Sequence, residues 1–266
     1  DNSISWGKSY ADLAGGGFTG LLDTYSGAAA AYSLRQLSST YSGDAIVVRR
    51  ASDNTTQAIG FVDNELDTTS LESFCSGTDG FVTTWYDQSG NGYDMAQVNA
   101  SRQPKIISAG STLILNSKPA IQSTTTNEMI SSWALAANLF SFMAVFEFTG
   151  TNSRLFTTDG SSSGMRNTLG NDLKVKSLSD IALISNTTSQ GQLLASGFGT
   201  SSFSGYVNGN LEGTGNLGSS YQSGSLQLGA GAGLAGSVQE MIFYTTDESA
   251  NQSGIETNIN DFYTIY

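Results

Sequence analysis

The sequence predicts an all-β protein, an antiparallel β-sandwich with a few short helices. Three observations predict this fold class. Short segments rich in Val, Ile, Leu, Phe and Tyr recur along the chain and are bounded by Gly, Ser, Asn and Asp. Helical periodicity is confined to three places. The length of 266 residues suits one large all-β domain with a sizeable core.

Ten segments are expected to be strands, and residues 140–148 show the pattern best. Every second side chain there is apolar, which predicts a sheet with one strongly buried side. The residues on that side are Phe140, Phe142, Ala144, Phe146 and Phe148. The other expected strands are 45–50, 81–86, 112–115, 154–158, 173–178, 192–197, 203–207, 225–228 and 238–244.

Three segments are expected to be helices. Residues 28–37 combine an alanine run with Leu34 and Leu37, residues 69–74 follow the cap-like Asp67, and residues 247–263 place apolar side chains on one side. Residues 1–27 contain three consecutive glycines and little periodicity, so they are expected to form an N-terminal arm or a first loop. The sandwich domain is then expected to span residues 28–266.

The composition excludes several kinds of chemistry. The chain has no histidine, which rules out Ser-His-Asp and Cys-His catalysis and histidine-ligated zinc. Its formal charge of −12 argues against nucleic acid and against anionic membranes as partners, because both require clustered Lys and Arg. No apolar stretch reaches the length of a membrane span. The single cysteine, Cys75, cannot form an internal disulfide.

The most specific stretch of the chain is residues 74–92, which contains Phe74-Cys75 and then Tyr86-Asp87-Gln88-Ser89-Gly90. It resembles the Phe-Cys…Tyr-Asp-Gln-Ser-Gly region of the catalytic domain of B-type α-L-arabinofuranosidases. Residues 236–244 and 255–259 look like the closing strand and terminal helix of laminin G-like domains. Together the likeness spans residues 28–266 and implies a concanavalin A-like sandwich, or jelly roll.

The same resemblance exposes departures from the family. The position that carries the partner of the Phe-Cys cysteine in the family is Gly80 in this chain, so that disulfide is lost. The chain lacks the family's Cys-Cys pair and has no glutamate between Glu147 and Glu212, where the nucleophile is expected. Residues 228–233, where the second catalytic carboxylate is expected, contain no acid. These departures favour a scaffold without catalysis.

The segment that follows residues 81–86 has two interpretations. Asp87 can accept backbone N–H groups and so close the turn, with Gly90 and Gly92 supplying left-handed backbone. Asp87 and Asn91 are alternatively ligands for a glycan or for calcium, the one candidate cofactor, because oxygen-rich turns suit hard cations.

Aromatic residues beside polar loops are candidate sugar platforms. Trp85 and Tyr86 point to opposite faces of their strand, and Tyr93 and Trp133 lie next to polar segments. Asp159 lies nearest to the position of the family's nucleophile, but the residues around it fit a hairpin turn equally well. The candidate ligand-binding set is therefore Trp85, Tyr86, Asp87, Asn91, Tyr93, Trp133 and Asp159, and no catalytic residue is assigned.

A glycosidase needs two carboxylates flanking one bond. The central acids available are Glu147, Asp159, Asp172 and Asp180, with Glu240 in a later strand, and no pair stands out among them. The expected function is a non-catalytic glycan-recognition or adhesion domain of a phage surface, tail or fibre protein. The expected partners are host-surface or extracellular polysaccharide, other virion subunits and further copies of the chain. The expected location is extracellular or on the virion surface.

Two alternatives remain open. The first is a glycoside hydrolase related to arabinofuranosidases, with an acid pair that the sequence does not reveal. The second is a structural capsid or decoration protein that binds only other virion subunits.

Overall fold

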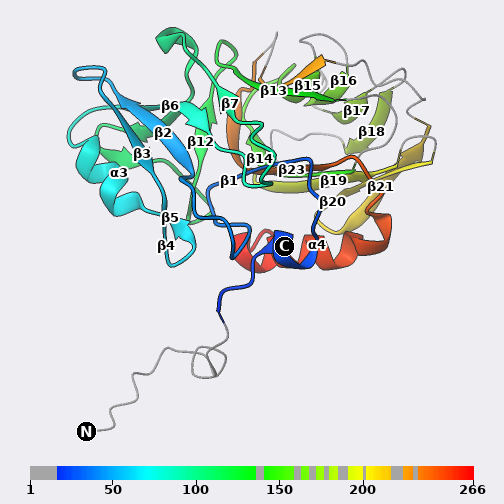
Figure 1. The fold of residues 1–266 in the computed structure, drawn as a ribbon. Coiled ribbons are helices and arrows are strands. Elements are labelled where there is room, and N and C mark those ends of the chain that lie inside the picture. Colours follow the sequence, from blue (N-terminus) through cyan, green and yellow to red (C-terminus); the bar gives the residue numbers. More distant parts are fainter. Residues whose placement is uncertain are drawn as a thin grey trace, which may run out of the picture.

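The computed structural model describes residues 17–135, 141–158, 163–167, 172–176, 180–184, 191–199, 202–216, 224–229 and 233–266. These residues form an antiparallel β-sandwich with one helix layer beneath it (Figure 1). The fold class predicted from the sequence is confirmed. Among the helices of the described residues, none is long and apolar enough to cross a membrane.

One layer of the sandwich is built around β14 and β23, which make the most extensive strand pair of the chain. Its strands run in the order β21 (Asn210–Gly215), β20 (Phe203–Val207), β19 (Leu193–Phe198), β14 (Ser141–Phe148) and β23 (Gly236–Tyr244). Two short strands share the far edge of β23, β1 (Ala30–Ser33) and β12 (Ile121–Ser123).

The second layer lies above the first in Figure 1. Its order is β18 (Asp180–Ile184), β17 (Leu173–Lys176), β16 (Ser163–Asn167), β15 (Arg154–Thr158), β22 (Gly224–Leu228), β13 (Met129–Leu135) and β7 (Met95–Ala96). The core between the layers is rich in aromatic rings: Phe156 meets Phe142 and Phe243 edge to face, with ring centroids 5.2 and 5.0 Å apart.

A third group of strands continues from β7 around the side of the sandwich. It contains β3 (Thr56–Ile59), β2 (Ile46–Arg50), β6 (Gly80–Trp85), β8 (Lys105–Ser108) and β9 (Ser111–Thr112). Two small hairpins complete the strands: β4 (Phe61–Val62) with β5 (Glu65–Leu66), and β10 (Ile114–Leu115) with β11 (Lys118–Pro119). The helical elements are α2 (Leu21–Thr24), α3 (Thr68–Phe74), η1 (Ala100–Arg102), η3 (Ser249–Asn251) and α4 (Gln252–Tyr263).

All ten predicted strands are found, and the segment 112–115 divides between β9 and β10. Two of the three predicted helices are also confirmed. Asp67 caps α3 by accepting the backbone N–H of Ser70, and α4 begins at Gln252, later than expected, because a 3-10 turn precedes it. The predicted helix at 28–37 is wrong. Ala30–Ser33 forms β1 instead, since pairing with β23 and burial on both faces outweigh the helix propensity of alanine.

The prediction that β14 buries only one side is also wrong. Phe142, Phe146 and Phe148 point into the core between the layers. Met143 and Val145 point the other way, into a second cluster that includes Ile255 and Ile259 of α4. The helix therefore covers the face of β14 opposite to its phenylalanine side chains. The same cluster takes in Leu21 of α2, so part of the predicted N-terminal arm packs against the sandwich.

Cys75 lies beside Gly80, the position that the resemblance pairs with it. Cys75 is buried and has a free thiol, and burial raises its pKa. A Cβ atom added to Gly80 would lie 2.8 Å from the Cys75 Sγ and 2.9 Å from the Cβ of Ile107. Residue 80 therefore points at the thiol at a distance that suits a bridging pair.

We expect Gly80→Cys to form a disulfide with Cys75. A disulfide that closes so short a loop lowers the conformational entropy of the unfolded chain, which stabilises the fold by about 2 kcal/mol. The close contact of the new side chain with Ile107 offsets part of this gain. Thiol titration of the unfolded, unreduced variant counts its free thiols and so shows whether the disulfide has formed. Urea unfolding measures the change in the free energy of unfolding. Gly80→Ala is the control, because it adds the crowding without the sulfur. Two free thiols in the folded variant would contradict the expectation.

Candidate functional site

The turn that follows β6 is held by the carboxylate of Asp87. Its Oδ1 accepts the backbone N–H groups of Ala31 and Ser89 at 2.8 and 2.9 Å. Its Oδ2 accepts the Ser89 hydroxyl at 2.8 Å and the backbone N–H of Tyr93 at 3.0 Å. Gly90 and Gly92 have positive φ, as the sequence predicts. Asp87 thus joins the turn to β1. These contacts agree with the interpretation in which Asp87 closes the turn.

The predicted calcium ligands lie within the same turn. The Asn91 side chain donates to the carbonyl oxygens of Ala28 and Ala29 at 3.1 and 3.0 Å. Because both Asp87 oxygens already accept protein donors, a cation here would displace existing hydrogen bonds. The described residues contain no cluster of three or more His, Cys, Asp or Glu side chains that could hold a metal. Calcium binding by Asp87 and Asn91 stays a prediction.

The predicted aromatic platforms divide into core and surface residues. Trp85 is completely buried, with its ring 5.9 Å from that of Tyr32, so it is a core residue. Trp133 is only 6% exposed and packs between Tyr93 and Phe243. Tyr93 is half-buried and stacks on Trp133 at an interplanar angle of 27°. Its backbone carbonyl accepts the hydroxyls of Tyr32 and Ser131.

Tyr86 and Asp159 complete the predicted set. Tyr86 is half-buried, and burial together with the charges of Asp44 and Asp94 raises the pKa of its phenol. Asp159 follows β15 directly and lies outside the described residues. The structure therefore brings Tyr86, Asp87, Asn91 and Tyr93 together at one turn and places Trp85 and Trp133 in the core.

A hollow of about 310 Å³ lies beside this turn, between α2 and residues 88–90. Its lining is polar and apolar in about equal parts, and its polar side chains include Asp23, Tyr41 and Ser89. Burial alone would raise the pKa of Asp23, but hydrogen bonds from Ser38, Ser39 and Gly20 outweigh it and lower the pKa. Asp23 is therefore held as a carboxylate whose oxygens accept protein donors. Hydroxyl, amide and carboxylate groups of this kind are suited to sugar hydroxyls.

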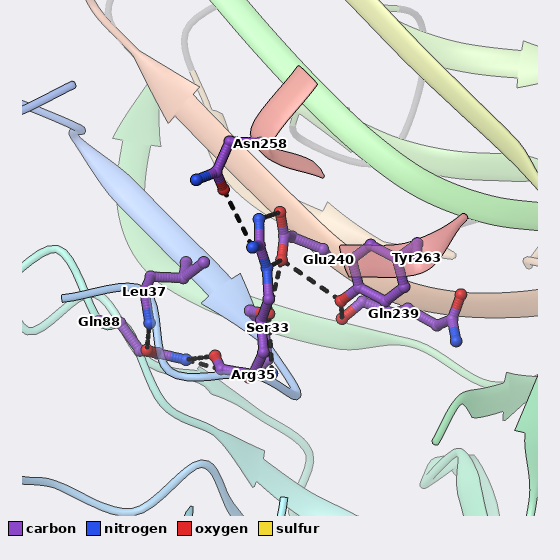
Figure 2. A network of polar contacts seen from close by, with 8 residues as sticks. All are labelled: Ser33, Arg35, Leu37, Gln88, Gln239, Glu240, Asn258 and Tyr263. Atoms are coloured by element: carbon purple, nitrogen blue, oxygen red, sulfur yellow. Dashed lines mark hydrogen bonds and ion pairs between the residues drawn. The ribbon is translucent and has the colours of Figure 1, made fainter. Parts of the chain in front are cut away.

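A buried ion pair, which the sequence analysis missed, joins the first strand to the last strand and helix (Figure 2). Arg35 donates to both carboxylate oxygens of Glu240, from Nε at 2.7 Å and from Nη2 at 3.0 Å. Its Nη1 donates to the Oδ1 of Asn258 in α4 at 3.0 Å. The Ser33 hydroxyl also donates to Glu240, at 2.8 Å. The carboxylate of Glu240 therefore has a structural partner on every side.

Gln88 connects this network to the turn. Its Oε1 accepts the backbone N–H of Leu37 at 2.8 Å, and its Nε2 donates to the carbonyl oxygens of Ser33 and Arg35. A bulge at Gln239, where the pairing of β14 with β23 shifts, puts Glu240 on the same face as Ile242 and turns Val238 to the other face. Strict alternation along residues 238–244 would put all three side chains on one face, and the bulge makes this wrong for Val238.

Glu256 of α4 is the third buried carboxyl group of the described residues, and it has no cationic partner among them. Burial raises its pKa, although hydrogen bonds from Ser196 and Gln252 partly oppose the shift. The folded protein therefore favours the protonated carboxyl. Its contribution to stability is fully present below the unfolded pKa and is lost as the pH rises through the raised folded pKa.

We expect Glu256→Gln to make the protein more stable than the wild type at pH 7, where the buried carboxyl must otherwise ionise. The difference should disappear near pH 4. Urea unfolding at the two pH values measures the effect. Glu212→Gln is the matched control, because Glu212 is exposed and should show no such dependence. A variant that is less stable than the wild type at both pH values would contradict the expectation.

Comparison with known proteins supplies the family context. The family model of the α-L-arabinofuranosidase B catalytic domain matches residues 23–124. This range contains β1, the Asp87 turn and most of the strands at the side of the sandwich. The resemblance predicted from residues 74–92 is confirmed over that range. No curated protein sequence matches the chain.

Several solved structures share the fold. An arabinofuranosidase complexed with arabinofuranosyl-α-1,2-xylobiose is 19% identical, with a TM-score of 0.65 over 91% of this chain. A variant GH54 α-L-arabinofuranosidase soaked with 4-nitrophenyl α-L-arabinofuranoside is 17% identical, with a TM-score of 0.67 over 90% of this chain. A third, soaked with a cyclic sulfate inhibitor, is 18% identical with a TM-score of 0.66. The chain spans 64% of the length of each of these proteins.

These findings correct the expected function. The prediction of a non-catalytic adhesion domain on a phage particle is wrong, because the matching family model is that of a catalytic domain. The prediction that the chain is not an enzyme is overturned by the same match. A carbohydrate partner stays a prediction, because solved structures of such low sequence identity show the fold alone. None of these comparisons supports the finer classification as concanavalin A-like or laminin G-like.

Proposed function

We propose that the chain is a glycoside hydrolase domain that releases α-L-arabinofuranosyl groups from polysaccharide side chains. The observation that carries the proposal is the match of residues 23–124 to the arabinofuranosidase B catalytic family. The fold shared with arabinofuranosidase structures and the polar, weakly charged surface support it. Because such polysaccharides lie outside cells, we also propose an extracellular location. Self-association stays a prediction, and the virion subunits fall with the phage function.

The chemistry requires two carboxyl groups on either side of the glycosidic bond. One protonates the leaving oxygen, and the other acts as nucleophile or activates a water. Asp87 and Glu240 are held by protein donors, and Glu256 is buried beneath the sandwich between α4 and β19, so none of the three is suited to either role. The catalytic groups are then expected among the acids that the resemblance places centrally: Glu147, Asp159, Asp172 and Asp180.

The described residues include three of these acids. Glu147 lies near the end of β14 and is half-buried, and Asp172 precedes β17 and is also half-buried. Asp180 begins β18, so Asp172 and Asp180 belong to the layer formed by β15–β18. Asp159 comes directly after β15 in the sequence and lies outside the described residues. We propose Asp159 as one member of the pair, because it lies nearest to the family's nucleophile position.

The test is hydrolysis of 4-nitrophenyl α-L-arabinofuranoside by the purified chain. We expect release of 4-nitrophenol, and we expect Asp159→Asn to lower kcat by about 100-fold or more, the size of a lost acid, base or nucleophile. Glu147→Gln, Asp172→Asn and Asp180→Asn search for the second group. Asp53→Asn is the control, because Asp53 lies in an exposed ion pair with Arg50. No hydrolysis of this substrate, and no arabinose from arabinan, would overturn the proposal.

A further inference from the structure

The hollow beside the Asp87 turn lies apart from the candidate catalytic acids. All the described residues that line it fall within 22–41 and 88–90. The helix α2 forms one side of the hollow and packs against α4. Figure 1 shows β15–β18 in the layer farthest from α4. The hollow is therefore a separate surface feature, and we call it the Asp23 hollow.

One wall of the Asp23 hollow is a chain of hydroxyl groups. Asp23 is a carboxylate, so the Ser38 hydroxyl is the donor in its 2.7 Å contact with Asp23 Oδ1. A hydroxyl group has only one proton to donate. The Thr40 hydroxyl lies 2.9 Å from that of Ser38 and must therefore donate to it. Thr40 thus has only oxygen lone pairs left for a further partner.

Tyr41, the next residue along this wall, has the same property. Its hydroxyl donates to the backbone carbonyl of Asp44 at 2.8 Å, so its proton is also used within the protein. Burial, together with the charges of Asp94, Asp44 and Asp87, raises the pKa of this phenol to about 12, and the phenol stays protonated at neutral pH. The side chains of residues 40 and 41 therefore offer hydrogen-bond acceptors to a ligand and no donor.

The Asp23 hollow is also negatively charged. Asp23 supplies the charge, and no Lys or Arg occurs among the described residues of the lining. While Oδ1 accepts the Ser38 hydroxyl, Oδ2 accepts the backbone N–H groups of Gly20 and Ser39 at 2.7 and 2.8 Å. The charge repels an anionic ligand, and an ammonium group would have to displace donors that already occupy the carboxylate. A neutral ligand that is rich in donors fits this wall best.

The rest of the lining is apolar side chain or bare backbone. Leu22 and Ala28 contribute carbon surface. A Cβ atom added to Gly27 or Gly90 would meet no atom within 4 Å beyond its chain neighbours, so the space beside both backbone positions is open. The volume of about 310 Å³ is that of a small-molecule site. Carbon surface beside hydrogen-bond acceptors suits a sugar ring, whose C–H face and hydroxyl groups need one each.

We propose that the Asp23 hollow binds one neutral sugar unit of a polysaccharide. Ring hydroxyls donate to Thr40 and Tyr41, and the C–H face of the ring lies on Leu22. The charge of Asp23 and the two acceptors select against sugars that carry carboxylate or sulfate groups. This site goes beyond the proposed function, because it holds the polysaccharide at a place apart from the candidate catalytic acids and needs no hydrolysis.

The test is titration of the full chain with xylotriose and with cellotriose, two neutral trisaccharides that contain no arabinose. Amide NMR spectra locate the binding. We expect saturable shifts, in the millimolar range, at residues 22–41 and 88–90 with at least one of the two. Trigalacturonate, which is anionic, should bind at least fivefold more weakly. No saturable shift with either neutral sugar, or shifts confined to residues 141–184, would overturn the site.

Variants at Thr40 test the wall directly. Thr40→Val removes one acceptor and keeps the shape of the side chain, so binding should weaken about 3–10-fold, the effect of one lost hydrogen bond. Thr40→Arg places a longer side chain in the hollow and should weaken binding more than tenfold. The matched control is Thr126→Val, because Thr126 is also exposed and its hydroxyl also contacts that of a residue two positions away, Thr124.

The control should stay within twofold of the wild type, and equal weakening by Thr40→Val and Thr126→Val would overturn the proposal. Thermal unfolding of each variant shows that it is folded. Sugar binding without hydrolysis of 4-nitrophenyl α-L-arabinofuranoside supports the site and overturns only the proposed function. Hydrolysis without binding of either neutral trisaccharide overturns only the site. If fully deacetylated chitotriose binds more tightly than both and is released by salt, the hollow recognises amines, which contradicts a neutral ligand.

Discussion

Replacing Arg35 by methionine is expected to lower the free energy of unfolding by about 3–5 kcal/mol, because it leaves a completely buried carboxylate without its partner. Glu240 has no exposed surface, and the Arg35 side chain is 8% exposed. Methionine fills much of the volume of the arginine stem but supplies no donor. Of the donors in Figure 2, only the hydroxyls of Ser33 and Tyr263 would remain on the carboxylate.

The loss extends beyond one ion pair. Arg35 lies against the rings of Phe262 and Tyr263, with its guanidinium carbon 5.0 and 5.7 Å from their centroids. It also donates to Asn258. All three residues belong to α4, so the substitution loosens the docking of the helix as well as the buried pair. Hydrogen exchange should show the largest loss of protection in α4 and β1.

Two controls make the result specific. Arg102→Met removes a pair with Glu128 in which the arginine side chain is 50% exposed, and it should cost less than about 1 kcal/mol. The double variant Arg35→Met, Glu240→Leu removes both charges and should recover much of the loss. Urea unfolding of the wild type, the two single variants and the double variant measures the four free energies of unfolding. A loss of less than about 1 kcal/mol for Arg35→Met would show that Glu240 finds another partner.

Local patterns predicted the strands well. Segments such as 203–207 and 154–158 are short stretches that contain Val, Leu, Phe or Tyr and are flanked by turn residues, and this signal depends on a few neighbouring positions. The error at 28–37 arose where local propensity and tertiary pairing disagree. Alanine favours a helix, but small side chains also allow β1 to lie against β23 with the core on one side and α4 on the other. Nothing within residues 28–37 reveals which of the two prevails.

The candidate site was predictable only in part. The turn at Asp87 follows from its own residues, because an aspartate before glycines at positions of positive φ closes such a turn locally. The pairing of Arg35 with Glu240 joins residues 205 positions apart and has no local signature.

The second large effect is expected at Asp87. Asp87→Ala should lower the free energy of unfolding by about 3–4 kcal/mol, because four donors lose their acceptor, one of them buried and three partly buried. The Ala31 N–H is the most costly of these, since its residue has no exposed surface. The turn and β1 should loosen together. Asp87→Asn keeps one oxygen acceptor but places an NH₂ group against existing donors, so it should recover only part of the loss.

Asp67→Ala provides the matched comparison. Asp67 is also a carboxylate that accepts from its own segment, but it takes two hydrogen bonds, both from Ser70 at the start of α3. Loss of such a cap costs about 1 kcal/mol. If Asp87→Ala costs no more than Asp67→Ala in urea unfolding, the turn does not depend on its carboxylate, and Asp87 becomes available as a ligand for calcium or sugar. If it costs three times as much, Asp87 is committed to the fold, and the acids that act on substrate must be sought elsewhere in the chain.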